Sequence, residues 1–167
     1  MSSQVADEEN RFALIEVTCS QDCDFKDHAD TFGVQMCLIH NVFIRCLNCI
    51  YYYAPRVKKG DEIAFAGYCL LLTEALHTHH QEEEGLLFPF LQTKFDMNRN
   101  LEQHASFNTK ITPFEEYIRG VMDKKEAFDG EKVRNLVESF GDDLVEHLHE
   151  EVIFNSNPLV NKLISNL

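Results

Sequence analysis

The stretch HHQEEEGLLFP, residues 79–89, decides how this chain is expected to fold. It places a histidine four residues before a glutamate twice, as His79–Glu83 and His80–Glu84, and His147–Glu151 repeats the spacing. On an α-helix, residues four apart lie one above the other, with about 5–6 Å between their Cβ atoms. Each pair therefore offers an imidazole and a carboxylate to the same point, which is enough to hold a metal ion from one side.

The apolar residues around these pairs predict which of them face a protein core. His80 and Glu84 fall on an apolar stripe that continues to Phe88, and His79 and Glu83 are rotated off that stripe by one residue. His147 and Glu151 lie on the stripe of Phe140, Leu144 and Phe154. A buried glutamate without a partner costs several kcal/mol. Two glutamates on core faces therefore call for a cation.

Helical periodicity fills most of the chain, and strand signals are scarce. Four helical blocks are predicted, at about residues 31–53, 61–94, 99–128 and 131–154. Ala54-Pro55 ends the first block, Pro89 predicts a kink or break in the second, and Pro113 should bend the third or split it. We expect an all-α, up-down-up-down four-helix bundle in a single domain, residues 1–167, with a core bundle of about 31–155 and extra terminal segments. The first thirty residues stay unassigned, and the tail from Asn155 to Leu167 is expected as a short helix or a loose segment.

Each remaining helix also carries a histidine on its apolar face, His40 in the first block and His104 in the third. A single core histidine is more often a hydrogen-bonded packing residue, and a run such as Glu82–Glu84 is most often a solvated face. The coincidence of four helices at one depth favours a metal site instead. The predicted ligands are His40, His80, Glu84, His104, His147 and Glu151. Two carboxylates that can each bridge indicate two metals, and mixed imidazole and carboxylate ligands suit iron, with zinc and manganese as competitors.

Composition limits the partners. The 167 residues carry 15 Lys plus Arg against 28 Asp plus Glu, a net charge of −13, which argues against nucleic acid or an anionic membrane as partner. No secretory signal or membrane-length apolar run is recognised, so a soluble, cytoplasmic protein is expected. The six cysteines are then expected as free thiols. A zinc or redox role for the Cys46–Cys49 pair is the weaker interpretation, because no second C-x-x-C follows.

The order of these motifs resembles the hemerythrin family in its HHE cation-binding form. The segment from His79 to Pro89 is similar to that family's second-helix motif. Similar motifs for the first, third and fourth helices are His40-Asn41 with Arg45 and Asn48, Gln103-His104 with Phe107, and His147-Leu148-His149-Glu150-Glu151. The resemblance spans about residues 31 to 155. Ferritin-like diiron bundles fit less well, because they use Glu-x-x-His, the opposite order.

The resemblance implies a pair of iron ions that bind dioxygen, for reversible oxygen binding, oxygen or iron sensing, or redox chemistry. In the family the third helix often carries His-x-x-x-His, whereas here Asn108 follows His104. The metal held by His104 and His147 is therefore expected to lack a protein ligand, with His77 and His149 as second-choice substitutes. Three hypotheses stay open. The first is an oxygen- or iron-binding carrier, sensor or store, the second an oxidase, oxygenase or peroxidase acting on a small organic substrate beside Asn108, and the third a metal-free helical interaction module.

Overall fold

A computed structural model describes residues 9–17, 28–155 and 157–164. Within these ranges most of the chain is helical, and there is no strand. Four long helices make up the body of the protein: α2 (His28–Tyr53), α3 (Glu62–Glu82), α5 (Asn98–Met122) and α6 (Gly130–Asn155). Shorter elements connect or follow them: a 3₁₀ turn at Ala54–Arg56, a π-helical turn at Glu83–Leu87, α4 (Phe88–Leu91) and α7 (Pro158–Ile164).

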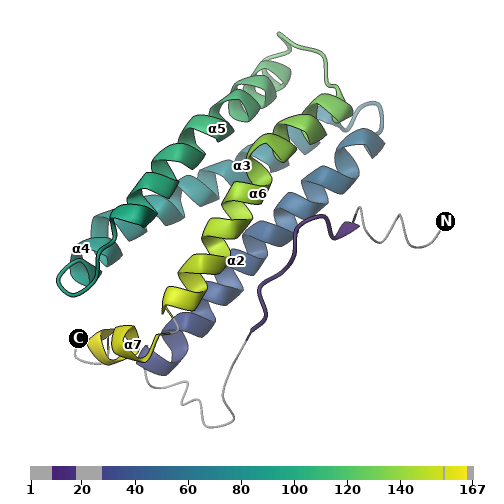
Figure 1. Ribbon diagram of the computed structural model, residues 1–167. Coiled ribbons are helices and arrows are strands. Elements are labelled where there is room, and N and C mark those ends of the chain that lie inside the picture. The colour runs from purple at the N-terminus through teal and green to yellow at the C-terminus, as the bar shows by residue number, and fades with distance from the viewer. Residues whose placement is uncertain (1–8, 18–27, 156, 165–167) are drawn as a thin grey trace.

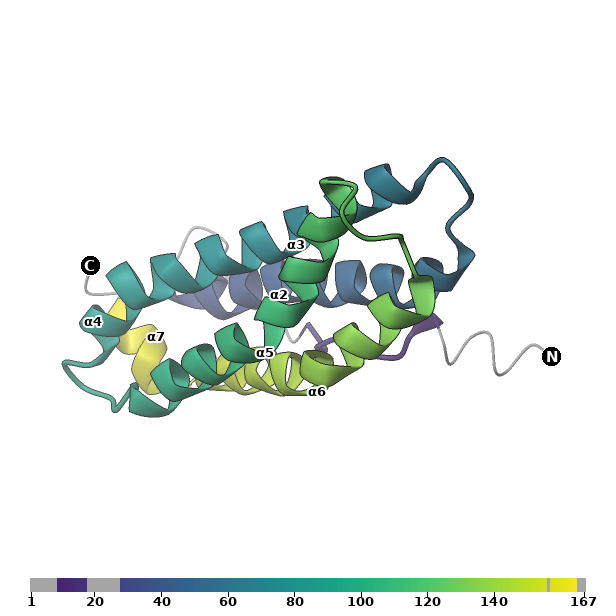
Figure 2. The same ribbon diagram turned by 90° about the horizontal axis from the view of Figure 1, so that it is seen from above.

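The four long helices run up, down, up and down as two hairpins, α2–α3 and α5–α6 (Figures 1 and 2). Helix α6 packs against both α2 and α5, and α3 packs against α5, so the ring of helices encloses one core. The predicted up-down-up-down bundle is confirmed.

A continuous core fills the bundle because each helix repeats apolar residues at three- and four-residue steps. The side chains with almost no exposure include Ile44, Leu47, Leu76, Ile111, Phe114, Phe140, Leu144 and Leu148. Along α3 and into the π-helical turn, buried positions that include Cys69, Thr73, Leu76, His80 and Glu83 alternate steps of four and three. This is the spacing of a helix that packs lengthwise against neighbours.

The predicted breaks fall only partly where proline stands. Pro55 lies in the 3₁₀ turn after α2, and Pro89 lies in the first turn of α4, directly after the π-helical turn at Glu83–Leu87. Pro113 does not split its helix, because α5 continues through it to Met122. The ring of Pro113 points to solvent, between the buried side chains of Ile111 and Phe114.

Helix α7 closes one end of the bundle. Val160 and Ile164 on α7 pack with Phe88, Leu91 and Met97 in a second, smaller apolar cluster. Figures 1 and 2 place α7 between the beginning of α2 and the α4 end of the bundle. Over residues 158–164 the tail is thus a short packed helix, the first of the two forms expected for it.

An extended N-terminal segment, residues 11–15, lies along α2 and α6. The Asn48 side chain both accepts a hydrogen bond from the Phe12 N–H and donates one to the Phe12 carbonyl, each at 2.8 Å. Asn41 does the same for Ile15, at 2.8 and 2.9 Å. The two amides are seven residues apart, so they share one face of α2 and hold the segment as a neighbouring strand would.

The first long helix is also apolar. Over Thr31–Arg56 it is long and hydrophobic enough to cross a membrane by length and composition, and 56% of its most apolar window is buried within the bundle. A core helix packed on α6 meets the same criterion, so the hydropathy of α2 is accounted for by its packing.

Candidate metal centre

Seven polar side chains meet in the interior at about the middle of the bundle. Helix α2 supplies His40, α3 supplies His79 and His80, and the π-helical turn supplies Glu83. Helix α5 supplies His104, and α6 supplies His147 and Glu151. Six of them are at most 3% exposed, and the His79 side chain is 11% exposed.

The donor atoms form two groups. In the first, those of His40, His79, Glu83 and Glu151 lie within 4.8 Å of one another. Nε2 of His40 lies 2.9 Å from Nε2 of His79. Two nitrogens bound at a right angle to one metal, each at about 2.1 Å, are themselves about 3.0 Å apart. The spacing therefore matches two imidazoles that share one metal ion.

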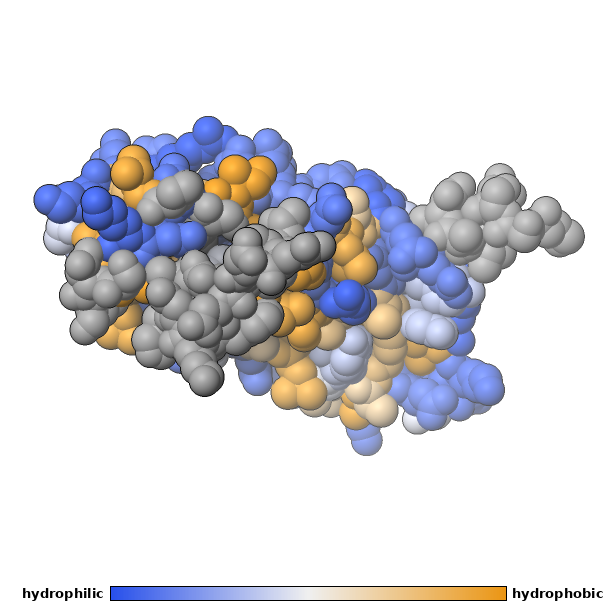
Figure 3. All heavy atoms as spheres, turned by 90° about the horizontal axis from the view of Figure 1, so that it is seen from below, coloured by the Kyte–Doolittle hydropathy of each residue, from blue (hydrophilic) through white to orange (hydrophobic). Residues whose placement is uncertain are grey.

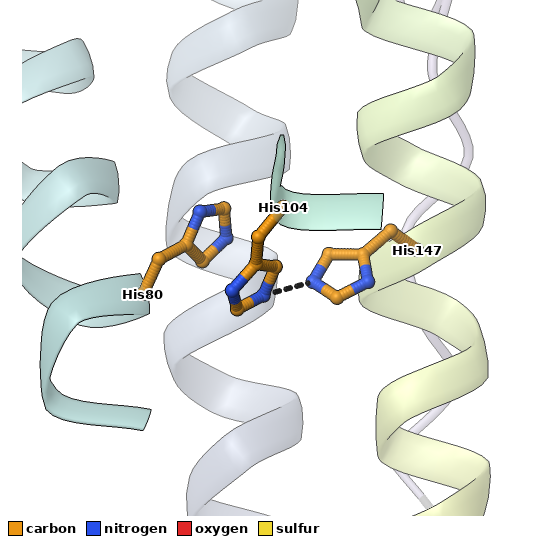
Figure 4. Close-up of side chains that lie close together, drawn as sticks. All are labelled: His80, His104 and His147. Atoms are coloured by element: carbon orange, nitrogen blue, oxygen red, sulfur yellow. Dashed lines mark hydrogen bonds between the residues drawn. The ribbon is translucent and has the colours of Figure 1, made fainter. Parts of the chain in front are cut away.

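The second group consists of His80, His104 and His147, whose donor atoms also lie within 4.8 Å of one another. Figure 4 shows the three rings converging from α3, α5 and α6. Nε2 of His104 lies 3.0 Å from Nε2 of His147, and the rings of His80 and His104 stack with their centroids 3.9 Å apart. This group also has the spacing of imidazoles around one cation.

Two carboxylates join the groups. Glu83 places Oε1 3.1 Å from Nε2 of His79 and Oε2 3.7 Å from Nε2 of His104. Oε2 of Glu151 lies 3.6 Å from Nε2 of His40 and equally far from Nε2 of His147. Each glutamate thus faces one histidine of each group, which is the position of a bridging ligand between two cations.

The outer nitrogens of three rings are held by acceptors. Nδ1 of His40 lies 2.9 Å from the Leu148 carbonyl, Nδ1 of His104 lies 2.8 Å from Glu84, and Nδ1 of His147 lies 3.3 Å from Oε1 of Gln103. These acceptors place the proton on Nδ1 and leave the Nε2 lone pair directed inward. Gln103 is held in turn by Glu150, which also pairs with Arg99.

Burial favours the neutral form of every group in the site. Burial, together with the neighbouring histidines, lowers the pKa of His40 and His147 to about 3 and the pKa of His79 to about 4. Burial likewise lowers the pKa of His80 and His104. Neutral imidazoles are the form that binds metal, so protons do not compete for these nitrogens at neutral pH. Burial raises the pKa of Glu83 and Glu151, and the two carboxyls repel each other's charge at Glu83.

A cation would satisfy what the protein atoms leave unpaired. Both ring nitrogens of His80 and all four carboxyl oxygens of Glu83 and Glu151 are buried without a hydrogen-bond partner among the described residues. The facing Nε2 atoms of His104 and His147 both carry lone pairs, because their protons are on Nδ1. Buried polar groups in this state each cost on the order of 1–3 kcal/mol. Five imidazoles and two carboxylates around two points fit a pair of transition-metal ions.

The structure corrects the predicted role of Glu84. Its side chain is 42% exposed and lies outside both groups, bonded to Nδ1 of His104. Glu83, predicted to be off the apolar stripe, takes the inward place, and His79 enters with it. The buried positions step by three residues from His80 to Glu83, and the backbone widens into a π-helical turn at the same residue. The sequence signal for an inward-facing His79 and Glu83 was their own His-x-x-x-Glu spacing.

The second-choice residues do not join the site. Asn108 is exposed, so it marks no open position beside His104. His80 stands with His104 and His147 and supplies the third imidazole that the sequence left missing. His77 pairs with Glu115 on α5, and His149 lies 3.0 Å from the Ala13 carbonyl of the N-terminal segment. The other five predicted ligands, His40, His80, His104, His147 and Glu151, are brought together as donors.

The fold and the donor set define a cation-binding helical-bundle domain. Residues 39–152 match the family model described as "Hemerythrin HHE cation binding domain", a range that includes all seven donors. The chain belongs to the hemerythrin family.

A curated relative and the solved structures add the following. The chain is similar to the dimeric xanthone biosynthesis cluster protein R11 of Cryptosporiopsis sp. (strain 8999), with 30% identity over 135 residues. The alignment covers 77% of this chain and 51% of the relative, so this chain spans about half the length of that protein. No solved structure matches the chain.

Proposed function

We propose that this protein is a non-haem diiron protein that binds dioxygen between its four long helices, as a carrier, sensor or store. The observation that carries the proposal is the pair of buried, unpartnered carboxylates, each facing one histidine of each imidazole group. A helical protein does not otherwise keep two glutamates close together in an apolar interior, because the burial of each carboxyl group would be uncompensated there.

The donor types favour iron. Imidazole and carboxylate ligands suit iron, manganese and zinc, whereas thiolates, which draw zinc toward structural sites, are absent from the seven donors. Carboxylates that bridge two positions are typical of diiron and dimanganese helical bundles. Iron is therefore the proposed native metal, with manganese and zinc as possible substitutes.

The two positions differ in their number of imidazoles. The group of His40 and His79 has two, and the group of His80, His104 and His147 has three. The carboxylates are shared, so the His40 and His79 position has one protein donor fewer. We place the binding of an outside ligand such as dioxygen there, and not beside Asn108. A pair of iron ions bound at the site would supply reversible electron transfer to that ligand.

The protein residues around the site hold its donors in place and limit access of water. Phe107 packs edge-on against His80, Phe88 lies against His104, and Phe43 lies against His79. Leu148 and Gln103 hold the outer nitrogens of His40 and His147, so neither ring can rotate its lone pair out of the site. An apolar environment in which the donors are already held in position suits the binding and release of a small ligand.

A second candidate is an oxidoreductase that acts on a small organic substrate. It is favoured by the name of the relative, which assigns that protein to a biosynthesis cluster for dimeric xanthones. In this chain an organic substrate would have to approach the His40 and His79 position. Because Asn108 is exposed, it gives no support to an open substrate position beside His104.

Metal content and spectra test the proposal. Protein purified without oxygen should contain about two irons per chain, and admission of air should produce absorption bands of an oxidised diiron centre. Reversible binding of dioxygen supports the carrier, sensor or store. Consumption of dioxygen only in the presence of an added organic compound supports the oxidoreductase. A chain that binds neither iron nor another transition metal would reject both and leave the interaction module.

A further inference from the structure

A cleft of about 600 Å³ lies where α2 turns into α3, apart from the metal centre. Its lining includes Cys49 and Tyr53 of α2, Lys58 of the connecting loop, and Phe65 and Tyr68 of α3. Cys49 follows His40 by nine residues on one helix, about 13 Å along its axis. The cleft is therefore a separate site, and none of the seven donors lines it.

Flat, apolar surfaces dominate this cleft. Tyr53, Phe65 and Tyr68 contribute three aromatic rings, and Val57 and Ala64 add aliphatic surface. The rings of Phe65 and Tyr68 lie 6.5 Å apart, and Phe65 is braced from behind by Phe128 at 5.9 Å. A volume of this size matches the sites that proteins use for small organic molecules, about 300–1,000 Å³. Rings held by such packing favour a planar, aromatic ligand.

The cleft also gathers positive charge in an acidic protein. Arg56 and Lys58 line it together with a single acid, Asp61, whereas the whole chain carries a net charge of −13. The Arg56 guanidinium lies over the Tyr52 ring, 4.0 Å from its centroid, and donates a hydrogen bond to the Tyr52 carbonyl, so its position is fixed. Local cations beside aromatic rings favour an aromatic ligand that bears a negative charge.

Figure 3 views the molecule from below, the side on which α2 lies nearest the viewer. Orange and tan residues gather there below the grey segments, beside blue residues toward the lower right. The large exposed apolar residues of α2 and α3 include Leu38, Val42, Tyr53, Tyr68 and Leu71. The cleft itself is lined by residues of the end of α2, the connecting loop and the start of α3.

We propose that this cleft binds a small planar aromatic carboxylate, with its rings against Tyr53, Phe65 and Tyr68 and its carboxylate toward Arg56 and Lys58. The site is independent of the metal centre, so it stands or falls separately from the proposed diiron function.

The exposed Cys49 thiol at the cleft gives a local readout. The rate at which iodoacetamide alkylates Cys49 is measured by peptide mass spectrometry on the full-length protein, with 2-naphthoate as probe. The buried thiols of Cys37 and Cys69 serve as internal references. We expect 2-naphthoate to slow Cys49 alkylation in a saturable way and neutral 2-naphthalenemethanol, of the same size, to do so at least several-fold more weakly.

Charge reversal tests the recognition of the carboxylate. Lys58→Glu should raise the concentration of 2-naphthoate that gives half-maximal protection of Cys49 by roughly three- to tenfold. This is the effect expected when one exposed charge interaction is lost and reversed. Lys94→Glu makes the same change in net charge beyond α4, at the opposite end of the bundle, and should leave protection unchanged. Both lysines are exposed, so neither substitution disturbs the core.

Three results would overturn the proposal. The first is no saturable protection of Cys49 at millimolar 2-naphthoate, and the second is equal protection by the neutral alcohol. The third is protection that depends on protein concentration instead of the probe, which would make the cleft a contact between two copies of the chain. Iron content measured on the same samples reports the metal centre, so a failure here is distinguishable from a failure of the diiron proposal.

Discussion

Glu83 and Glu84 are adjacent and chemically identical, yet their surroundings give them different tasks. Glu83 is 3% exposed and faces His79 and His104 with oxygens that have no hydrogen-bond partner. Glu84 has a 42% exposed side chain and contacts the site only from outside, through Nδ1 of His104. Glu83 is therefore the proposed bridging ligand, and Glu84 is the proposed acceptor that orients a histidine ligand.

Alanine substitutions distinguish these two roles. Glu83→Ala should abolish binding of both metals, because both groups lose a shared carboxylate. Glu84→Ala should keep a stoichiometry of two and weaken metal affinity by roughly 10- to 100-fold, as loss of an acceptor behind a histidine ligand does. Metal titration followed by elemental analysis measures both effects. Glu82→Ala, at an exposed neighbouring position, is the control. Full metal content in Glu83→Ala would reject the bridging assignment.

Sequence periodicity could identify the site and four of its five histidines, but not the choice between neighbouring residues on α3. At about 100° of rotation per residue, Glu84 lies about 40° past the direction of His80 around the helix, and Glu83 lies about 60° short of it. The two glutamates therefore lie on opposite sides of His80, and both are near its face of the helix. Which one turns inward depends on how α3 packs against α5 and on the widened turn at Glu83. This choice depends on tertiary packing, so the spacing of residues along a single helix cannot predict it.

The pKa of Glu83 predicts how the metal-free protein responds to pH. Burial and the neighbouring Glu151 raise it from 4.5 to about 10. Between these values the unfolded chain has released this proton and the folded chain retains it, so the free energy of unfolding falls as pH rises. The histidines contribute little above pH 7, because their folded pKa values lie below 6.5 and they are neutral in both states.

From pH 7 to 8 the metal-free protein should therefore lose on the order of 1 kcal/mol of stability through Glu83. Urea denaturation at the two pH values measures this. The range stops at pH 8 because the buried Cys69, whose pKa is also raised, adds a loss of the same sign once unfolded thiols ionise. Glu83→Gln should reduce this slope to the part that comes from Glu151, whose pKa burial raises to about 7. An unchanged slope in that variant would contradict the assignment.

At the scale of elements, turns and asparagines position the helices that the donors stand on. The start of α6 touches the 3₁₀ turn after α2 so closely that a Cβ on Gly130 would lie 2.7 Å or less from the backbone of Ala54 and Pro55. Asn41 and Asn48 hold residues 12 and 15 against α2. Hydrophobic periodicity predicted the long helices, but such contacts between segments distant in sequence could not be read from it, since a glycine or asparagine alone names no partner.

Two glycine-to-alanine variants test this contact. Gly130→Ala should destabilise the protein by roughly 1–3 kcal/mol, because the new methyl group meets rigid backbone and α6 must shift. Gly67→Ala, within α3, meets nothing within 4 Å and should stabilise by about 0.5–1 kcal/mol through helix propensity alone. Chemical denaturation gives both values. If both variants were stabilised, α6 would not be held at Ala54 as described.

At the scale of the whole molecule, the metal centre is the one polar site to which all four long helices contribute among the described residues. Apolar packing joins α2 to α6 and α3 to α5 without any metal. Without cations, however, two carboxyls and His80 lie unpaired in its middle. Bound metal would therefore oppose separation of any one helix from the others.

Metal removal should accordingly lower the stability of the entire bundle and not of one hairpin. Ligands that bind only the folded state stabilise it by about 2.7 kcal/mol per site when present at 100 times their dissociation constant. Metal-loaded protein should therefore melt several degrees above chelated protein in a single transition, measured by calorimetry. Hydrogen exchange should slow in α2, α3, α5 and α6 alike, because each helix contributes a donor. Glu83→Ala provides the control, since its melting temperature should no longer respond to metal or to chelator. If protection rose in only one hairpin, the donors of the other would not reach the cations, and two metals shared by four helices would be the wrong description of this protein.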